Sequence, residues 1–176
     1  DLSKDAAGMT ARRDRAWEVA VADVRRGLPL RDGSAQVLLN AFAPRNAATF
    51  SRTLSATGIA IVAVPSEDHL VELRHAVGLL RVEPMKLDRL VHQSAGYLAL
   101  ADVMSVDESL TFDSAAIADI LMMTPNAWHL TDAHRCRAAA LTRLTMTVSF
   151  RVAVFRKARQ VTKANRRLGV WPSSKT

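Results

Sequence analysis

The sequence predicts an α/β fold, a doubly wound sheet of mostly parallel strands flanked by helices. Two continuous apolar runs of strand length occur at Val37–Leu39 and Ile59–Val64, and continuous apolarity is typical of parallel strands buried on both faces. Each run is followed by a polar loop and then a helical pattern, which is the strand–helix alternation of this fold class. Late in the chain, Leu144 to Phe155 alternates strictly and predicts an antiparallel element at the sheet edge.

The composition indicates a single basic globular domain. The chain has 176 residues, 49% of them hydrophobic, and a formal net charge of +7. This charge favours polyanionic partners such as nucleic acid about as much as it reflects an arginine-rich composition. Cys136 is the one cysteine, so neither a disulfide nor a cysteine-based metal site is expected, which suits a reducing cytoplasm. No apolar run is long enough to span a bilayer, so no membrane partner is expected.

The amino-terminal third is expected to carry one helix, a short strand and the first core strand. Ser3 can cap a helix to about Arg13, residues 18–22 read as a strand ending at Asp23, and residues 28–33 form a turn-rich loop. The first core strand is expected over 35–41. The chain begins at Asp1, in what looks like a strand end, which suggests that an amino-terminal part of a longer protein is missing.

Capped helices are expected around the second core strand. Asn46 is a plausible cap for a helix over 47–54, and Ser66 is a plausible cap for the helix after the strand. Gly58 is expected to form the turn into the strand. The helix after the strand has a core-facing stripe at helical spacing, formed by Leu70, Leu73, Val77 and Leu80.

The second half of the chain is expected to add helices and antiparallel strands. A short helix is expected within 85–93, a strand over 97–112, a helix to Met123 capped by Asp113 or Ser114, and a helix over 131–141 capped by Thr131 or Asp132. Residues 1–157 are therefore expected to form a partial domain. Residues 158–176 are basic without any acidic residue and are expected to form a flexible tail.

The loops after the two core strands are the first candidates for an active site, because ligands bind outside the carboxyl ends of the strands in open α/β sheets. In the loop from Asn40 to Asn46, the Phe42 ring can stack on a planar base, polar groups can bond the base edge, and Pro44 can rigidify the loop. The alternative is a surface loop with Phe42 tucked into the core. His69 can contact a ligand at the second strand end, although a lone histidine there is more often a surface or capping residue.

Other candidates are weaker. Asp1 could accept hydrogen bonds from ribose hydroxyls, although a helix cap is the favoured interpretation, and Asp23 could accept one from an adenine amino group or merely begin a turn. The sequence has no His/Cys metal cluster, nucleophile elbow, Walker motif or G-x-G-x-x-G loop. Trp128 is expected to pack in the core.

Six short motifs occur in the same order as in a known family: D-L-S-K at 1–4, V-A-D-V at 21–24, L-P-L-R-D-G at 28–33, N-A-F-A-P-R-N at 40–46, D-H-L-V-E-L at 68–73 and M-T-P-N-A-W at 123–128. Each motif alone is weak, but the ordered set is specific. Over roughly residues 1–157 the chain resembles the 23S rRNA guanine-N1 methyltransferases, and is most similar to the actinobacterial branch that includes tylosin-resistance enzymes.

The resemblance implies a cytoplasmic class I, Rossmann-like methyltransferase that uses S-adenosylmethionine on a guanine N1 in a 23S rRNA hairpin. It links one branch to antibiotic resistance and leaves a homodimer open. Carried over by position, Asp1 would bind the ribose, Asp23 and Val24 would lie by the adenine, and His69 would contact the cofactor. The loop from Asn40 to Pro44 would face the methyl group and the target base. The catalytic base stays unassigned, because Asn40 cannot serve as a strong one.

The sequence departs from this family in its amino-terminal features. The zinc module with four Cys/His ligands, the helical linker, the first strand and its glycine-rich D-I-G-x-G-x-G loop have no counterpart. Zinc is therefore expected only in the missing module, and the chain is expected to be a fragment of such an enzyme, inactive alone. The main alternative is a non-catalytic RNA-binding remnant, and a third is a nucleotide-binding enzyme of another class. An in-frame glycine loop upstream in the genomic DNA would favour the enzyme; a start codon near Asp1 would favour the remnant.

Overall fold

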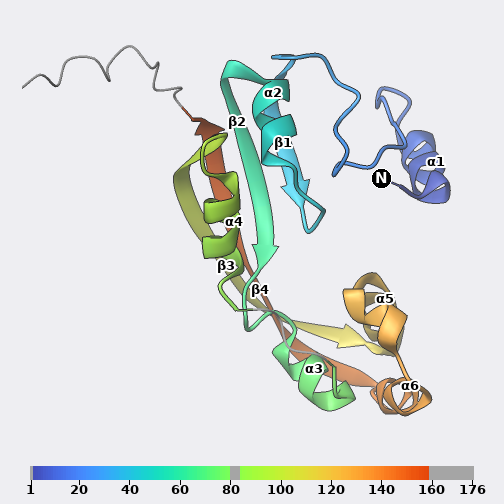
Figure 1. Ribbon diagram of the computed structural model, residues 1–176. Coiled ribbons are helices and arrows are strands. Elements are labelled where there is room, and N and C mark those ends of the chain that lie inside the picture. Colours follow the sequence, from blue (N-terminus) through green and yellow to red (C-terminus); the bar gives the residue numbers. More distant parts are fainter. Residues whose placement is uncertain (1, 80–83, 159–176) are drawn as a thin grey trace, which may run out of the picture.

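The computed structural model describes residues 2–79 and 84–158 (Figure 1). Its helices and strands follow one another in the order α1 (Lys4–Arg13), β1 (Ala35–Ala41), α2 (Ala47–Thr53), β2 (Leu54–Pro65), α3 (Val71–Val77), α4 (Lys86–Ser94), β3 (Leu98–Asp113), α5 (Ser114–Met123), the 3-10 helix η1 (Pro125–His129), α6 (Asp132–Ala139) and β4 (Arg143–Lys157).

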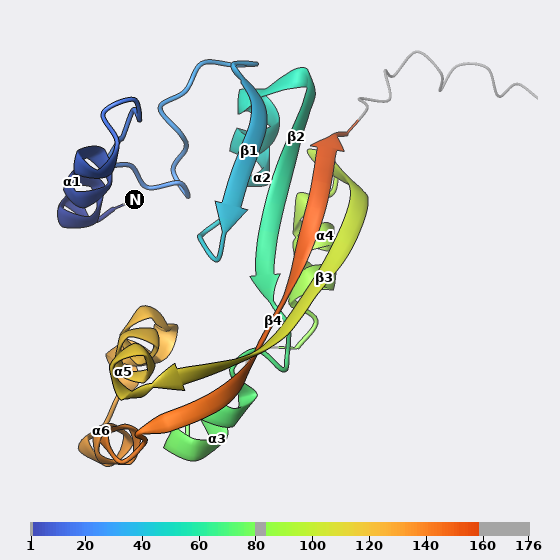
Figure 2. The ribbon, with the colours of Figure 1, turned by 180° about the vertical axis from the view of Figure 1, so that it is seen from behind.

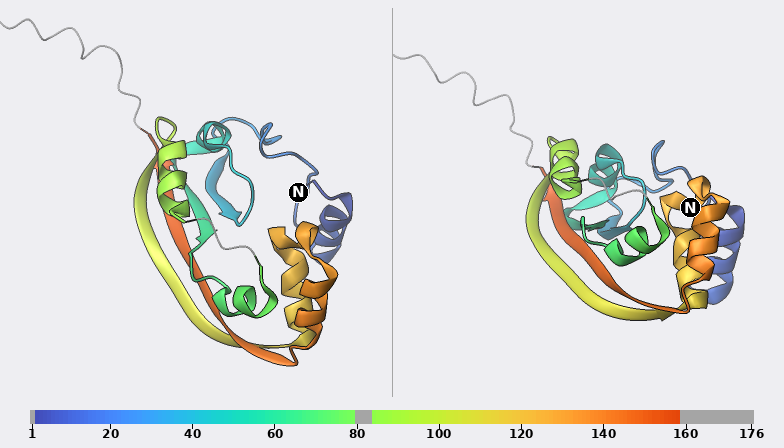
Figure 3. Two further views of the ribbon diagram at one scale, coloured as in Figure 1. Left: turned by 60° about the horizontal axis from the view of Figure 1, so that its bottom comes forward. Right: turned by 90° about the horizontal axis from the view of Figure 1, so that it is seen from below.

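The four strands form one mixed sheet in the order β1-β2-β4-β3. β1 and β2 are parallel, and β4 is antiparallel to both of its neighbours. The antiparallel strand predicted over 144–155 is confirmed as β4, but its predicted edge position is wrong, because β4 pairs with β2 on one side and with β3 on the other. Helices α2 and α4 cover one face, whereas the opposite face of β1 and β2 carries no helix in the described part of the chain (Figure 2). The long β3–β4 pair curves, and α3, α5 and α6 lie inside the curve (Figure 3).

Most predicted helices form, because their caps form. Side-chain oxygens of the four predicted residues Ser3, Asn46, Asp113 and Thr131 accept hydrogen bonds from backbone N–H groups in the first helical turn, at 2.9 to 3.3 Å. Each such bond satisfies one of the amide groups that a helix start leaves without an intrahelical partner. The short helix predicted within 85–93 is confirmed as α4.

The strand predicted over residues 18–22 is wrong. This segment has no regular secondary structure and pairs with no described strand, and Val19 and Val21 are exposed. A strand exists only through hydrogen bonds to a neighbour, and none lies beside it. The turn predicted at Gly58 is also wrong, because β2 already begins at Leu54 and runs through it. Glycine fits there for another reason: a Cβ at position 58 would lie 2.8 Å from the Ala35 carbonyl oxygen of β1.

Ser66 does not cap the third helix. Helix α3 begins at Val71 behind Leu70, whose backbone is left-handed with a φ of 55° and whose side chain makes no capping bond. The Ser66 hydroxyl instead hydrogen-bonds that of Ser149 on β4. Within the predicted stripe, Leu70, Leu73 and Val77 are buried, and Leu80 lies outside the described residues.

Two apolar clusters hold the fold, and β4 passes through both. Ala153 and Phe155 belong to a first cluster with buried side chains of α2, β2 and α4, whereas Met146 belongs to a second with buried side chains of α3 and α5. The prediction that the first core strand is buried on both faces is wrong. Val37 and Leu39 are exposed, because they lie on the face opposite Leu38, which no helix of the described residues covers (Figure 2).

The coil before β1 is fastened to α2. Arg52 donates hydrogen bonds from its guanidinium to the carbonyl oxygens of Leu28 and Leu30 and pairs with the Asp32 carboxylate. The Asn46 amide donates to the Arg25 carbonyl oxygen at 3.0 Å. These bonds place the turn at Asp23 beside the start of α2, and hence near the loop that follows β1.

Candidate active site at the carboxyl ends of β1 and β2

Asn40 is the polar side chain at the end of β1, and only one of the two polar atoms of its amide has a hydrogen-bond partner. The residue is 7% exposed, and its Nδ2 donates to the Pro44 carbonyl oxygen at 3.0 Å. Its Oδ1 is buried and has no hydrogen-bond partner in the described structure. A buried amide oxygen without a partner costs free energy, so this atom suits a hydrogen-bond donor on a ligand.

Phe42 is held in a strained turn just beyond the strand. Its φ of 53° is left-handed, which is uncommon for a bulky residue and recurs at functional sites. The amide N–H donates to the Ala63 carbonyl oxygen of β2 at 3.2 Å. The ring stacks on His69 with centroids 6.0 Å apart and meets Phe150 edge to face at 5.7 Å. It is 57% exposed, so it is not tucked into the core.

His69 lies half-buried beneath this ring, and its protonation is defined by one contact. Its Nδ1 accepts a hydrogen bond from the Ser149 backbone N–H at 3.2 Å, which assigns the proton of the neutral ring to Nε2. Burial, together with the positive charges of Arg74 and Lys86, lowers the pKa of His69 below its usual 6.5. The ring is therefore neutral near pH 7 and offers a donor at Nε2, not a basic nitrogen.

A polar network on the neighbouring strands supports His69, and the sequence did not reveal it. The Ser149 hydroxyl donates to the Asp107 carboxylate of β3, which also pairs with Arg151 at 3.3 Å. The bond from Ser149 is the main reason that the pKa of Asp107 is lowered, and Arg151 lowers it further. Ser149 lies 80 residues from His69 and 42 from Asp107, and no local motif signals such a separation.

The remaining predicted site residues, Asp1, Asp23 and Val24, make no recorded contact with Asn40, Phe42 or His69 in the described part of the chain. Asp1 lies outside the described residues. The Asp23 carboxylate accepts the Arg25 backbone N–H at 3.0 Å and pairs with Arg25 and Arg26; the backbone bond is the largest cause of its lowered pKa. Val24 packs against the first apolar cluster. The structure thus brings Asn40, Phe42, Pro44 and His69 together at one sheet end. Asp23 is linked to that end through Arg25, whose carbonyl oxygen accepts from Asn46.

The described residues contain neither a cluster of metal ligands nor a helix suited to a bilayer. No three His, Cys, Asp or Glu side chains in the described ranges gather closely enough to hold a metal ion. Among the helices of those same ranges, none has both the length and the apolar character needed to cross a membrane.

Curated relatives share much of this sequence. A 23S rRNA (guanine(748)-N(1))-methyltransferase of Streptomyces fradiae is 38% identical over 156 residues, which are 86% of this chain and 56% of that protein. A provisionally named 23S rRNA (guanine-N(1)-)-methyltransferase of Micromonospora griseorubida is 37% identical over 159 residues, 89% of this chain and 54% of its own.

The chain is related to the 23S rRNA guanine-N1 methyltransferases. The resemblance predicted from the six ordered motifs is thereby confirmed. The chain spans about half the length of the curated relatives it matches. No protein-family model matches it.

Solved structures show the fold class. A provisionally named methyltransferase from Bacillus halodurans superposes with a TM-score of 0.54 at 14% identity, over 89% of this chain and 80% of its own. The MccD protein superposes with a TM-score of 0.53 at 16% identity, over 90% of this chain and 78% of its own. At such identities the likeness concerns the fold alone, and it confirms the predicted class I methyltransferase architecture.

Proposed function

We propose that this chain provides the target-base side of a methyltransferase active site, which transfers a methyl group from S-adenosylmethionine to N1 of a guanine in 23S rRNA. The observation that carries the proposal is the unpartnered Oδ1 of Asn40, buried at the end of β1 two residues before the exposed ring of Phe42. A guanine edge presents N–H donors at N1 and N2, and an amide oxygen is their natural acceptor. The curated relatives named for this reaction support the choice of base and nucleic acid.

The residues at this sheet end fit the reactive end of such a cofactor. Bound S-adenosylmethionine supplies an electrophilic methyl group on a sulfonium. His69 would hold the cofactor through its Nε2–H, and Asn40 would orient the base through its amide oxygen. The Phe42 ring would stack on the guanine, a contact that aromatic side chains commonly provide to unpaired bases. The protein's main contribution is then positioning of the two reactants.

The other predicted residues would bind the adenosine part of S-adenosylmethionine. Asp1 would bind the ribose, and Asp23 with Val24 would border the adenine. His69 is excluded as the acceptor of the guanine N1 proton, because the one unprotonated nitrogen of its neutral ring already accepts from Ser149. Arg45, exposed in the same loop, would contact an RNA phosphate. Activity, substrate and cofactor are proposed for the whole enzyme of which such a site is a part.

The test is incorporation of labelled methyl from S-adenosylmethionine into 23S rRNA, with the product guanine identified. The chain is assayed alone and joined to the part of the Streptomyces fradiae relative that it does not span. We expect methylation at guanine N1 by the joined protein, and a loss on the order of 100-fold with Asn40→Ala, as for removal of one preorganised hydrogen-bonding group.

A matched control uses a second buried atom without a partner. The Thr53 Oγ1, on α2, is also buried and unpaired, so Thr53→Val removes a comparable polar atom away from the loop and should leave methylation unchanged. Urea unfolding of each variant separates lost activity from lost structure. Methylation by the joined protein that survives Asn40→Ala, or its absence from the unchanged joined protein, would refute the proposal.

A further inference from the structure

Among the described residues, the two large apolar side chains with the highest exposed fractions lie at the end of the molecule where α3, α5 and α6 gather, which we call the helical end (Figure 1). Trp128 of η1 is 90% exposed and Met123 at the end of α5 is 85% exposed, although core packing was predicted for the tryptophan. Met122 beside them is exposed as well. Isolated exposed apolar residues are ordinary, but a tryptophan and two methionines within seven residues form a patch of the kind that marks a binding surface.

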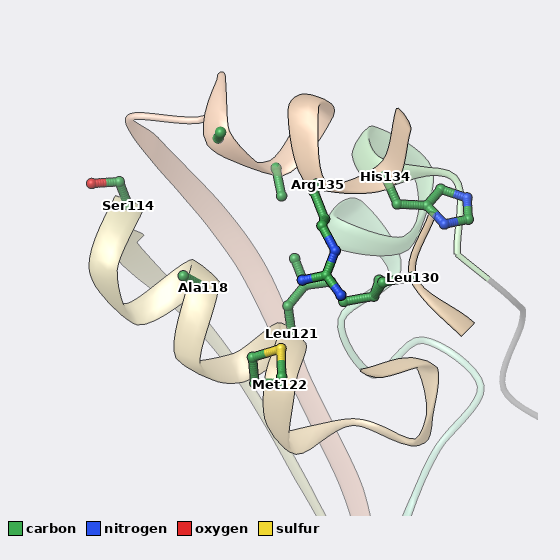
Figure 4. Close-up of a pocket in the computed structure, with 9 residues that line it drawn as sticks. Ser114, Ala118, Leu121, Met122, Leu130, His134 and Arg135 are labelled. Atoms are coloured by element: carbon green, nitrogen blue, oxygen red, sulfur yellow. The ribbon is translucent and has the colours of Figure 1, made fainter. Parts of the chain in front are cut away.

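A pocket of about 250 Å³ opens beside this patch, between α5 and α6. Its walls are mainly apolar, with Ala118, Leu121 and Met122 from α5 and Leu130 from the segment after η1. Arg135 extends from α6 across the space toward α5, and its guanidinium lies over Leu121 and Leu130 (Figure 4). The structure records no ion pair or side-chain hydrogen bond for this guanidinium within the described residues.

We propose that this patch and pocket form a second RNA contact, at which an unpaired nucleotide stacks its base on Trp128 and places its phosphate on Arg135. The chemistry is that of single-strand binding sites, where an aromatic face receives the base and a cation neutralises the backbone. The choice of RNA as the occupant rests on the function proposed above, on the net charge of +7, and on the unpaired guanidinium at the rim of an apolar surface.

The position of the patch suits a nucleotide near the target guanine. Strands β1 and β2 point toward the end of the molecule at which α3, α5 and α6 gather, as Figures 1 and 2 show. An RNA whose target base enters at Asn40 would continue toward this helical end. The pocket would therefore hold a neighbouring unpaired nucleotide, and would add affinity without touching the methyl group.

The test measures RNA binding without any cofactor, so its result does not depend on methyl transfer. The probe is single-stranded poly(A), and inorganic polyphosphate serves as a polyanion that has no bases. With Trp17 and Trp171 replaced by phenylalanine, the remaining fluorescence reports Trp128. We expect poly(A) to quench it and polyphosphate to leave it unchanged.

Binding affinities of variants complete the test. Trp128→Ala should weaken poly(A) binding by at least about fivefold, since one base–aromatic stack contributes this much or more, and Trp128→Phe should restore most of it. Arg135→Gln should weaken binding and Arg135→Lys much less. Binding of poly(A) with no quenching and no loss in Trp128→Ala would overturn this inference while leaving an RNA-directed function intact. Fluorescence that changes only with protein concentration would also overturn it, because a second copy of the chain would then cover the patch.

Discussion

His69 illustrates how a single backbone contact determines the chemistry of a side chain. The Ser149 N–H occupies Nδ1 and so fixes the tautomer of the neutral ring. Burial of the ring, with the positive charges of Arg74 and Lys86 nearby, lowers the pKa of His69, so the folded chain favours the neutral form. The folded-state pKa lies below the unfolded-state value near 6.5. Between these two values the unfolded chain binds more protons, so acid destabilises the folded chain.

This predicts a specific pH dependence of stability. The His69 contribution should be fully present above pH 6.5 and be lost as the pH falls through the folded-state pKa, with a slope of at most about 1.4 kcal/mol per pH unit. Urea unfolding of the unchanged chain and of His69→Gln across this range isolates the effect. Parallel curves for the two proteins would show that His69 does not titrate differently in the folded state.

At the residue scale, the position of the candidate site side chains could be predicted from the sequence, whereas that of their supports could not. Asn40, Phe42 and His69 follow apolar runs, and that position alone places them at the carboxyl end of a parallel sheet. The supports, Ser149 and Asp107, come from strands far away in the chain. The core packing predicted for Trp128 is wrong, because that prediction rested on residue type alone and an aromatic side chain can also lie exposed.

The β1–β2 pair shows why glycine is needed inside a strand. A Cβ at position 58 would meet the Ala35 and Gln36 carbonyl oxygens at 2.8 and 3.1 Å, next to the point where the register of the pair shifts. Gly58→Ala should therefore lower the free energy of unfolding by roughly 1–3 kcal/mol, the usual cost of overpacking.

The matched substitution lies in α1. Gly8→Ala replaces a mid-helix glycine whose Cβ would make only an ordinary contact, at 3.4 Å from an Arg12 side-chain nitrogen, and should not destabilise the chain, because alanine favours the helix. Urea unfolding compares the two variants. Equal stability for both would contradict the close approach of β1 to β2.

At the element scale, the helices were predictable because their signals are local. A capping side chain and an apolar stripe lie within a few residues of each other. The segment 18–22 has the apolar composition of a strand and is not one, since pairing depends on a neighbour that composition does not reveal. Ser66 had the right residue type for a cap, but Ser149 occupies its hydroxyl and α3 starts later.

At the scale of the whole molecule, one face of the sheet is apolar and exposed at β1. Leu39 is 71% exposed at the free edge of β1, and the sheet face beyond α2 and α4 lacks a helical cover in the described part of the chain. Exposed apolar edges favour pairing with another chain. We therefore predict concentration-dependent self-association that Leu39→Lys reduces.

Gln36→Lys is the control for this prediction. It adds the same charge to an exposed position of the same strand without removing an apolar side chain. Sedimentation velocity over a range of concentrations compares the three proteins. If Leu39→Lys self-associates as strongly as the unchanged chain, the free edge of β1 is not the contact.

The carboxyl ends of β1 and β2 are proposed to hold the reactive end of S-adenosylmethionine. The most direct measurement is calorimetric titration of S-adenosylmethionine into the chain joined to the part of the Streptomyces fradiae relative that it does not span. We predict saturable binding that His69→Ala weakens by roughly two- to tenfold, the loss expected for one hydrogen bond. No binding, or equal affinity for both proteins, would contradict the claim.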